Sequence, residues 1–310
     1  MAAIESWEWL VGLIDKGSFT RASEDLHISQ QTLSARLASL ERELGCKLVV
    51  RSSPLSLTRA GEAFLDYARE QNRSTTQMLR RLGEVTIGGA GNLKVGISNM
   101  HSRTLMPYAI DQFHCSMPGV SVKIIEGTNE ELVAMAEQGD ADVVITNFGA
   151  VHPGVTVRPL YHEEIVLVAK PELLAQVLQV NEGQAVERTR EEGLAALGNC
   201  PFLLTSPDDI SGRIARAELS RAHVKPEVLV ESDSIMTLLS LAAQGLGCVF
   251  CASTILEAAH DLTCDMVRIP LSDEARYEVS IGRPANVEPW APAQVFEDVV
   301  GALFGEGREA

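Results

Sequence analysis

The sequence has no long hydrophobic run, and its negative charges far outnumber its positive ones. Because no stretch of about 18 apolar residues occurs, no membrane-spanning helix is expected. The first residues also lack a positively charged segment followed by an apolar one, so no secretory signal and a cytoplasmic location are predicted. In that compartment the six cysteines are expected to be reduced thiols: Cys46, Cys115, Cys200, Cys248, Cys251 and Cys264.

Motifs of the common enzyme classes are also missing. There is no Gly-x-Ser-x-Gly elbow, no phosphate loop and no His-Glu-x-x-His helix, so we predict no catalytic residue, no metal ligand, no cofactor and no enzymatic activity. Cys248 and Cys251 have the spacing of a redox or metal pair, but no second pair accompanies them. They fall on a predicted strand, where residues three apart point to opposite faces, so buried core thiols are the preferred interpretation.

Charge divides the chain into two parts. The whole protein carries a formal net charge of −16, yet residues 1–90 contain eleven Lys and Arg against eleven Asp and Glu. The entire excess of acid therefore belongs to residues 91–310, which cannot lie comfortably on DNA and whose acidity we interpret as keeping a large assembly soluble. A length of 310 residues with 45% hydrophobic content suits two to three domains with cores of their own.

Two short helices joined by a tight corner are predicted between Ser18 and Arg51. Ser18 suits the N-cap of the first helix, which has a stripe of small and apolar side chains, and Ser29 suits the N-cap of the second. The second helix has three leucines at helical spacing, which are expected to be buried: Leu33, Leu37 and Leu40.

The outer face of the second helix is polar without the Glu–Lys pairs of an ordinary solvated helix. It presents Gln30, Gln31, Thr32, Ser34, Arg36 and Ser39. Amides near a helix N-terminus suit base edges in the major groove, with Gln recognising adenine and Arg recognising guanine. The pattern therefore predicts a helix-turn-helix that reads double-stranded DNA, with a plain helical hairpin as the alternative.

These residues resemble the N-terminal domain of LysR-type transcriptional regulators. The matching segments are residues 17–23 (GSFTRAS), 29–34 (SQQTLS), 40–51 (LERELGCKLVVR) and 57–61 (LTRAG). The resemblance implies an all-α winged helix-turn-helix domain over residues 1–60. We expect DNA contacts from Ser29, Gln30, Gln31, Thr32, Ser34, Arg36, Arg51 and Thr58.

The match has three departures. Gln31 stands where the family often has proline, and Val49 where it usually has phenylalanine. The wing loop, residues 52–56, has no Lys or Arg although many relatives carry several. Fewer phosphate contacts predict weaker non-specific DNA binding and a shallower salt dependence.

A single long helix is predicted from about Arg59 to Val85. A heptad-like seam runs along it: Phe64, Ala68, Gln71, Thr75, Met78, Leu82 and Val85. The resemblance implies that this linker helix, assigned to residues 61–88, pairs with that of a second subunit, giving a homodimer or homotetramer on a two-fold symmetric operator. The alternative is a helix folded back on its own C-terminal domain. Residues 88–91 (GGAG) are expected to form a hinge.

Strands and helices alternate after residue 91, which predicts an α/β domain with a parallel sheet covered on both faces. Residues 138–145 (QGDADVVI) and 244–249 (QGLGCV) match LysR effector domains. The resemblance implies a periplasmic-binding-protein-like domain over residues 92–310 with two Rossmann-like subdomains, one of about residues 92–162 and 269–304 and the other of about 163–268. The chain is expected to cross between them within residues 143–168 and 266–277. Strands are predicted at 93–97, 120–125, 143–145, 165–168, 202–204, 227–230 and 248–251, and helices at 102–115, 130–138, 211–222 and 234–244.

Small molecules bind open parallel sheets beyond the carboxyl ends of the strands. The predicted effector site therefore uses polar residues of those loops together with an aromatic wall: Ser98, Asn99, His101, Ser102, Thr128, Asn129, Asn147, Phe148, Thr205 and Ser206. Helix N-termini in these loops would favour an acceptor-rich anion such as a small carboxylate. The alternative for Ser102 and Thr128 is that they only cap their helices.

Three functions remain open from the sequence. The first is a ligand-responsive regulator that binds DNA and a small-molecule effector, with RNA polymerase as a candidate partner and no membrane. The second is a thiol-based redox sensor using Cys200, Cys248 or Cys251, although residues 202–222 supply no second cysteine near Cys200. The third is a solute-binding protein, which would explain only the C-terminal part.

Overall fold

The chain forms two compact units, Met1–Gly91 and Asn92–Ala310. The computed structural model describes residues 7–50, 52, 55–87, 91–285 and 290–305. Among these residues, no helix combines the length and the apolar character needed to cross a membrane.

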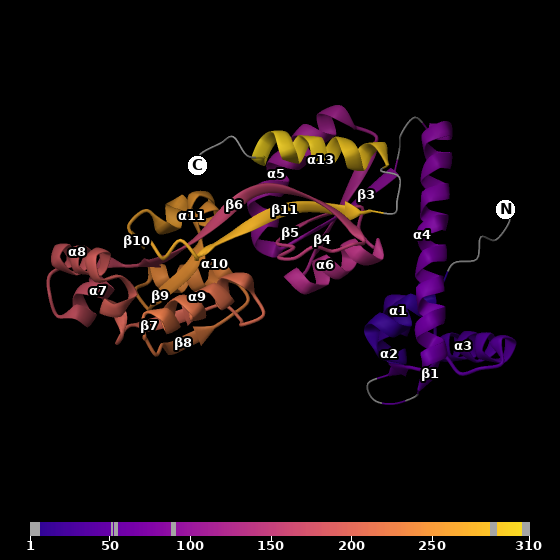
Figure 1. Ribbon diagram of the computed structural model, residues 1–310, viewed down its shortest axis with the longest axis horizontal. Coiled ribbons are helices and arrows are strands. Elements are labelled where there is room, and N and C mark those ends of the chain that lie inside the picture. Colours follow the sequence, from indigo (N-terminus) through magenta and orange to yellow (C-terminus); the bar gives the residue numbers. More distant parts are fainter. Residues whose placement is uncertain (1–6, 51, 53–54, 88–90, 286–289, 306–310) are drawn as a thin grey trace. The chain divides into compact units, whose positions relative to one another are not determined.

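The first unit is a winged helix-turn-helix followed by a long helix (Figure 1). Ser29 caps the recognition helix, because its Oγ accepts a hydrogen bond from the Thr32 amide at 3.1 Å. The predicted helix-turn-helix is thus confirmed, with Ser18 at the N-cap position of the preceding helix. The elements are α1 (Glu8–Lys16), α2 (Phe19–Asp25), α3 (Gln30–Leu44), β1 (Val49–Val50), β2 (Ser56–Leu57) and α4 (Arg59–Ile87).

A small leucine-rich core holds the helices of this unit together. The predicted Leu33, Leu37 and Leu40 are all buried in it. Ala68 of α4 is also part of this core, and Phe64 packs its ring edge-on against Trp7 with the centroids 5.2 Å apart. The N-terminal end of the predicted seam is therefore used within the chain, and it anchors α4 to the DNA-binding helices.

Farther along α4 the seam is open. Met78 is 40% exposed, which is high for a large apolar side chain. The side chains of Leu82 and Val85 and the predicted hinge at residues 88–90 lie outside the described residues.

Two residues that flank the wing, Glu41 of α3 and Gly61 of α4, hold the strand that enters it. Buried Glu41 accepts hydrogen bonds from the Leu48 amide at 2.9 Å and from Lys47 Nζ at 2.6 Å. Burial opposes ionisation of Glu41, but the bonds from Lys47, Leu48 and Val49 together outweigh it and hold the pKa of the carboxyl below its ordinary value. Gly61 lies so close to the Leu48 carbonyl that an added Cβ would be 1.9 Å from its oxygen. The strand entering the wing is thus fixed by a carboxylate on one side and a glycine on the other.

The second unit is an α/β domain. Its first half contains β3 (Gly91–Ile97), α5 (Asn99–Ser116), β4 (Val120–Glu126), α6 (Asn129–Gln138), β5 (Val143–Thr146), β6 (Val155–Ala169), α7 (Pro171–Leu178), α8 (Glu182–Glu192) and the 3-10 helix η1 (Gly193–Leu197). Its second half contains β7 (Pro201–Leu204), α9 (Ile210–Arg221), β8 (Glu227–Glu231), α10 (Ile235–Ala243), β9 (Cys248–Ala252), α11 (Ser253–Ala258), α12 (His260–Thr263), β10 (Val267–Ile269), β11 (Arg276–Pro284) and α13 (Ala291–Phe304).

The sheet is mixed, so the prediction of an all-parallel sheet was wrong. In the described residues its strands follow the order β4-β3-β5-β11-β6-β9-β7-β8, with β10 paired to β6. The β3–β5, β7–β8 and β7–β9 pairs are parallel as predicted. In contrast, β11 is antiparallel to β5 and β6, and β6 is antiparallel to β9 and β10. Of these strands, β6 and β11 are the segments by which the chain passes between the subdomains.

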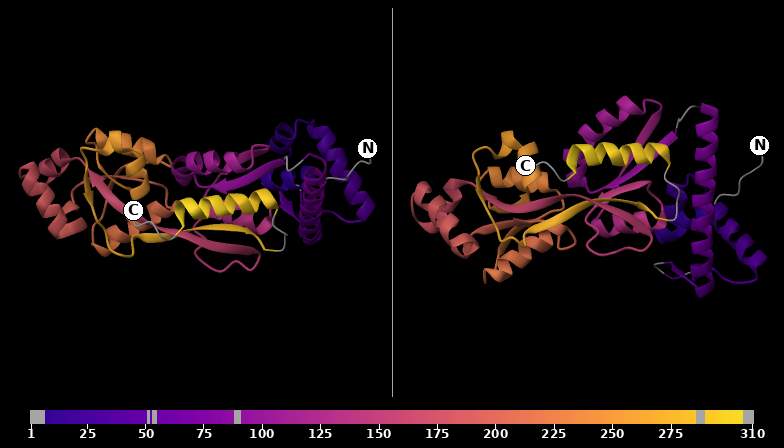
Figure 2. Two further views of the ribbon diagram at one scale, coloured as in Figure 1. Left: turned by 90° about the horizontal axis from the view of Figure 1, so that it is seen from above. Right: turned by 45° about the horizontal axis from the view of Figure 1, so that its top comes forward.

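The two crossing strands lie side by side along the domain in both views of Figure 2. They pair from Arg276 opposite Glu164 to Pro284 opposite Val155, with a register shift between Val279 and Ser280. The first crossing falls inside the predicted range of residues 143–168, whereas the second is carried by β11 and extends beyond the predicted 266–277. An antiparallel ladder, rather than two separate linkers, therefore joins the subdomains.

Helices cover both faces of the first subdomain sheet, as predicted. Along β5, Val143 and Ile145 face the large core that includes α5 and α13, while Val144 faces a second core under α6. Phe113 of α5 and Phe296 of α13 meet edge-on with their centroids 5.5 Å apart. The sequence analysis did not predict α7, α8, α13, β11 or the first ten residues of β6.

Candidate DNA-reading surface and effector cavity

The polar face of α3 is open to solvent. Gln30, Gln31, Thr32, Arg36 and Ser39 are exposed, and Ser34 is half-buried. The Ser29 and Thr32 hydroxyls are 2.8 Å apart, so they hold each other at the start of the helix. The long side chains of Gln30, Gln31 and Arg36 are therefore the ones best placed to reach a partner.

Two further predicted DNA contacts have different surroundings. Thr58 donates its hydroxyl to the Lys47 carbonyl at 2.6 Å and accepts the Gly61 amide at 3.0 Å, so it caps α4 and closes the wing. Arg51 lies outside the described residues.

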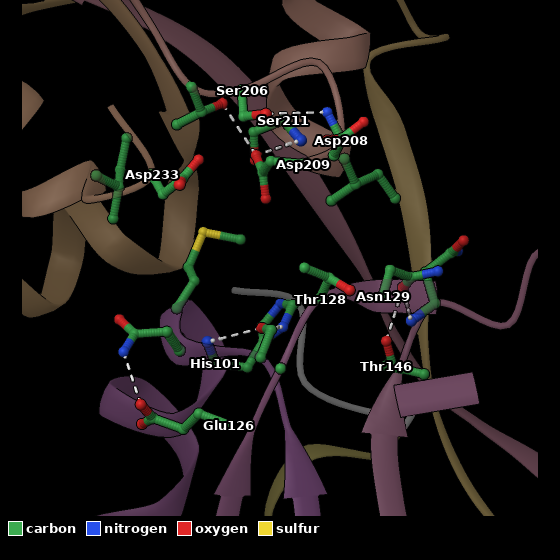
Figure 3. Close-up of a pocket in the computed structure, with 18 of the residues that line it drawn as sticks. His101, Glu126, Thr128, Asn129, Thr146, Ser206, Asp208, Asp209, Ser211 and Asp233 are labelled. Atoms are coloured by element: carbon green, nitrogen blue, oxygen red, sulfur yellow. Dashed lines mark hydrogen bonds between the residues drawn. The ribbon is translucent and has the colours of Figure 1, made fainter. Parts of the chain in front are cut away.

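A cavity of about 420 Å³ lies between the two subdomains of the second unit, at the carboxyl ends of the parallel strands. Figure 3 shows its two sides: His101, Glu126, Thr128, Asn129 and Thr146 come from the first subdomain and Ser206, Asp208, Asp209, Ser211 and Asp233 from the second. The volume falls in the range of small-molecule sites, about 300–1,000 Å³.

The structure brings most of the predicted effector residues to this cavity. The lining includes Ser98, Asn99, His101, Thr128, Asn129, Asn147, Thr205 and Ser206. Ser102 and Phe148 do not line it.

Both misplacements have a physical reason. The helix after β3 begins at Asn99 rather than Ser102, because Ser98 is the N-cap and its Oγ accepts the His101 amide at 3.3 Å; Ser102 is consequently buried inside the first turn. Phe148, only 7% exposed, packs in the core under α6. An added Cβ on Gly282 would be 2.3 Å from its ring, so the ring is held against β11 instead of forming a cavity wall.

Sequence reasoning missed several lining residues. These are Met100, Glu126, Gly127, Glu131, Thr146, Asp208, Asp209, Ile210, Ser211, Asp233, Ile235 and Tyr277. Most lie within a few residues of a predicted strand end, so the strand-end rule could have found them if wider windows had been taken. Tyr277 could not be found in that way, because it lies on β11, which depends on a partner strand far away in the sequence.

His101 forms the floor of the cavity and is fixed on both ring nitrogens. Its Nδ1 is 2.8 Å from Ser98 Oγ, and its Nε2 is 3.4 Å from the Tyr277 hydroxyl and 3.9 Å from Glu163 Oε2. Burial lowers the pKa of His101 to about 4, so the imidazole is neutral at physiological pH.

Glu163 connects this floor to the second subdomain. Its Oε2 accepts the Thr254 hydroxyl at 2.6 Å and its Oε1 accepts the Ser253 hydroxyl at 3.2 Å, both from α11. Burial raises the pKa of Glu163, and these hydrogen bonds only partly offset it. Residues of α5, β6, β11 and α11 thus meet in one polar cluster beneath the cavity.

The helix N-termini at the cavity are already occupied by oxygens of the chain itself. Asp209 accepts the Ser211 and Gly212 amides at the start of α9. Thr128 and Glu131 form a capping box at the start of α6. Fewer backbone donors are thus left for an anion than the sequence analysis assumed.

The charge of the lining contradicts the expected carboxylate ligand more directly. Five carboxylates line the cavity, and none of its lining residues is Lys or Arg: the acids are Glu126, Glu131, Asp208, Asp209 and Asp233. An anion in this site would face repulsion without a compensating cation. The lining therefore does not favour the anionic effector expected from the sequence.

The predicted core thiols Cys248 and Cys251 are buried as expected, and Cys248 lies next to Cys200 although residues 202–222 contain no cysteine. Cys200, Cys248 and Cys251 are all 0% exposed. Cys248 approaches Cys200, since Phe202 of β7 is in register with Cys248 of β9, and their thiols interact, which lowers the pKa of Cys200 and raises that of Cys248. The second cysteine near Cys200 thus comes from another strand. Among the described residues, no group of three or more His, Cys, Asp or Glu side chains could hold a metal ion.

A DNA-reading helix-turn-helix and a two-subdomain α/β unit with a central cavity, joined in one chain, define a transcriptional regulator with a built-in ligand-binding domain. Two family models agree with this class: the helix-turn-helix of bacterial LysR-family regulatory proteins matches residues 4–62, and the LysR substrate binding domain matches residues 87–304. The chain belongs to the LysR family of transcriptional regulators, proteins that bind DNA and small-molecule effectors and form oligomers.

Individual relatives support the same assignment. YcgK of Bacillus subtilis, an uncharacterised helix-turn-helix transcriptional regulator, is 30% identical over 79% of this chain and 78% of its own length. A full-length OxyR variant from Pseudomonas aeruginosa has a TM-score of 0.63 at 22% identity, covering 99% of this chain and 100% of the other. Full-length CbnR in complex with its target DNA has a TM-score of 0.58 at 20% identity, covering 94% and 96%. At these identities the two structures establish the shared fold.

Proposed function

We propose that this protein is a ligand-responsive transcriptional regulator that reads a two-fold symmetric operator through paired α3 helices and senses a small molecule in the cavity between its subdomains. The observation that carries the proposal is the exposed polar face of α3, capped by Ser29 and backed by buried leucines. Side chains of that kind match the hydrogen-bonding groups of the major groove. The proposal includes a cytoplasmic location, where such a regulator would have access to DNA.

Pairing of subunits is part of the proposal. One α3 helix reads only a few base pairs, so presentation of two on successive half-sites is needed for specific binding. Met78 of α4, a large apolar side chain that is exposed, is available for contact with a second copy. The proposal includes a homodimer or a homotetramer, with RNA polymerase as a candidate partner.

The link between cavity and DNA is an equilibrium between two subdomain arrangements. A ligand that contacts both sides of the cavity favours the closed arrangement by its differential affinity, and the closure alters the packing of effector domains in the oligomer. Because Glu163 and Tyr277 lie on the crossing strands β6 and β11, the floor of the cavity is where such a change would be transmitted.

The test is the ratio of affinities for operator and random DNA, measured by fluorescence anisotropy of the full chain. Gln30→Ala is expected to reduce this ratio by about fivefold to a hundredfold, the value of one bidentate base contact. Ser34→Ala is expected to reduce it less, because Ser34 is half-buried. Gln294→Ala, an exposed glutamine on α13 of the other unit, is the matched control. An unchanged ratio for Gln30→Ala would show that α3 is not the reading helix.

A second candidate function rests on the Cys200–Cys248 pair. Peroxide would oxidise the two thiols to a disulfide: both S–H bonds break, one S–S bond forms, and peroxide takes up two electrons and two protons to leave two waters. The lowered pKa of Cys200 favours the attacking thiolate, while complete burial of both sulfurs slows access. Peroxide treatment followed by non-reducing peptide mapping tests this function, with Cys200→Ser as control. Absence of a Cys200–Cys248 crosslink under conditions that alter DNA binding would remove it.

A further inference from the structure

The cavity between the subdomains has an unusual charge for a site at helix N-termini. Its carboxylates come from both sides: Glu126 and Glu131 from the first subdomain and Asp208, Asp209 and Asp233 from the second. The one titratable nitrogen on its floor, His101, is neutral at physiological pH. The site therefore attracts positive charge and repels negative charge.

Two of these carboxylates are not used by the protein itself. Asp209 and Glu131 are committed to helix caps, and Glu126 accepts the Asn99 side-chain amide at 2.7 Å. Asp208 and Asp233, in contrast, form no side-chain hydrogen bond and no ion pair within the described part of the chain. Both are exposed to the cavity, and Asp233 directly precedes Ser234, the N-cap of α10. They are free to accept hydrogen bonds from a ligand.

A buried hydroxyl in the lining of the same cavity provides a separate indication of a ligand. Ser211 is only 2% exposed and lines the same cavity, yet its Oγ has no hydrogen-bond partner in the described structure. An unpartnered polar group is costly to bury, so buried polar groups usually have a hydrogen-bond partner in the working state of the protein. Its backbone amide is held by Asp209 at 2.9 Å, which fixes the residue at the edge of the acidic group.

The remaining lining indicates the shape of the ligand. Met100, Ile210 and Ile235 provide apolar surface between the polar sides of the cavity. A metal ion does not fit, since no group of three suitable donors is found among the described residues. The lining thus suits an organic molecule with an apolar body and N–H donors.

We propose that the effector is a small organic cation, an amine whose ammonium groups are bound by Asp208 and Asp233, with Ser211 accepting a further N–H, and whose apolar body lies against Met100, Ile210 and Ile235. The inference rests on the proposed function, in which this cavity is the effector site. It also gives a reason for ligand-driven closure. Negative charge on both sides of the cleft opposes closure, and a bound cation removes that repulsion.

The experiment compares matched ligands that differ only in charge. Linear diamines of graded chain length, the dicarboxylates of equal carbon number and the corresponding diols are titrated calorimetrically into the full chain at about 20 mM and about 200 mM salt. At least one diamine is expected to bind about tenfold more tightly than its matched dicarboxylate and diol, and to weaken with salt. Equal or tighter binding of the dicarboxylates, or no binding by any diamine, overturns the inference.

Substitutions in the cavity test whether the diamine binds at Asp208 and Asp233. Asp208→Asn and Asp233→Asn are expected to weaken the diamine by about threefold to tenfold each, and Ser211→Ala by less. Asp140→Asn is the control, because this exposed acid follows the C-terminal end of α6 and the cavity is at its N-terminal end. Diamine binding that is unchanged in the Asp208→Asn, Asp233→Asn double variant refutes the assigned site.

Operator binding of the same samples separates the two proposals. If the protein binds operator and no diamine binds, the inference fails and the proposed function stands. If a diamine binds at Asp208 and Asp233 but no operator complex forms or responds, the cationic ligand class stands and the proposed function fails.

Discussion

Gly61→Ala is expected to destabilise the DNA-reading unit while leaving the stability of the effector domain unchanged. The new Cβ would be 1.9 Å from the Leu48 carbonyl oxygen, whereas ordinary contact begins near 3.4 Å, so the backbone must separate by about 1.5 Å. Rotation of a side chain cannot relieve this clash, since the obstructing atom is the main-chain oxygen of Leu48.

The energetic cost follows from the contacts that this separation breaks. The Leu48 oxygen accepts the Thr58 amide at 2.9 Å and the Thr58 hydroxyl at 3.2 Å. Loss of two hydrogen bonds costs about 2 kcal/mol, and overpacking costs about 1–3 kcal/mol more, so we expect a total of about 3–5 kcal/mol. The total free energy of unfolding of a domain of this size is about 5–15 kcal/mol.

Urea unfolding followed by tryptophan fluorescence measures this change. The sequence has three tryptophans, and in a Trp290→Phe background only Trp7 and Trp9 remain, both in the first unit. With a urea dependence of about 1–3 kcal/mol per molar, the midpoint should fall by at least about 1 M.

Gly45→Ala is the matched control. Gly45 has a positive φ of 70° with nothing within 4 Å of the added carbon, so only about 1 kcal/mol of backbone strain is expected. If Gly61→Ala unfolds no earlier than Gly45→Ala, the close approach at Leu48 does not determine the stability of the wing.

Three further perturbations test other contacts. Thr128→Val removes the capping box of α6 and should lower the stability of the second unit by about 1 kcal/mol and weaken the effector response. Thr128→Ser should retain both the stability and the response. Equal thermal unfolding of the two variants would contradict a stabilising role for the Thr128 cap. The pKa of the Glu41 carboxyl is lower in the folded state, so its ionised form stabilises the fold above about pH 4.5, and this stabilisation is lost as pH falls through the folded-state pKa. Glu41→Gln should therefore reduce the urea midpoint more at pH 7 than at pH 3. The pKa of His101 is about 4 in the folded state against 6.5 in the unfolded chain, so the second unit should lose stability as pH falls from about 6.5 towards 4. In acid unfolding, His101→Gln should lose less stability over this range. An unchanged pH dependence would refute the burial of His101 as a neutral imidazole.

Local signals made the first unit predictable. Ser29 as a cap, the buried Leu33 and Leu37, and the polar face of α3 all act within one or two helical turns, so the sequence alone specifies them. The same is true of α6, where Thr128 and Glu131 form a capping box within one turn.

The second unit was predicted less completely because several of its elements depend on distant partners. Residues 155–164 of β6 include Pro159 and two adjacent acids, a composition that indicates a strand only when β11 is present more than a hundred residues later. Eight of the ten predicted effector residues line the cavity because strand ends converge by topology. The preference for a cation that we propose could not be predicted in the same way, since the sequence does not reveal that Asp209 and Glu131 fill the helix N-termini while Asp208 and Asp233 remain open.

The antiparallel ladder between β6 and β11 also determines the order in which the chain can fold during its synthesis. The first subdomain begins with β3 but is completed by β11 and α13, roughly 180 residues later. At about 5–20 residues per second, the ribosome takes about 10–40 s to deliver them. The helix-turn-helix is therefore folded and able to meet DNA while the sheet of the sensor still has an open edge at β5, the position that β11 later occupies. Until β11 is added, that unpaired edge is open to pairing with another strand.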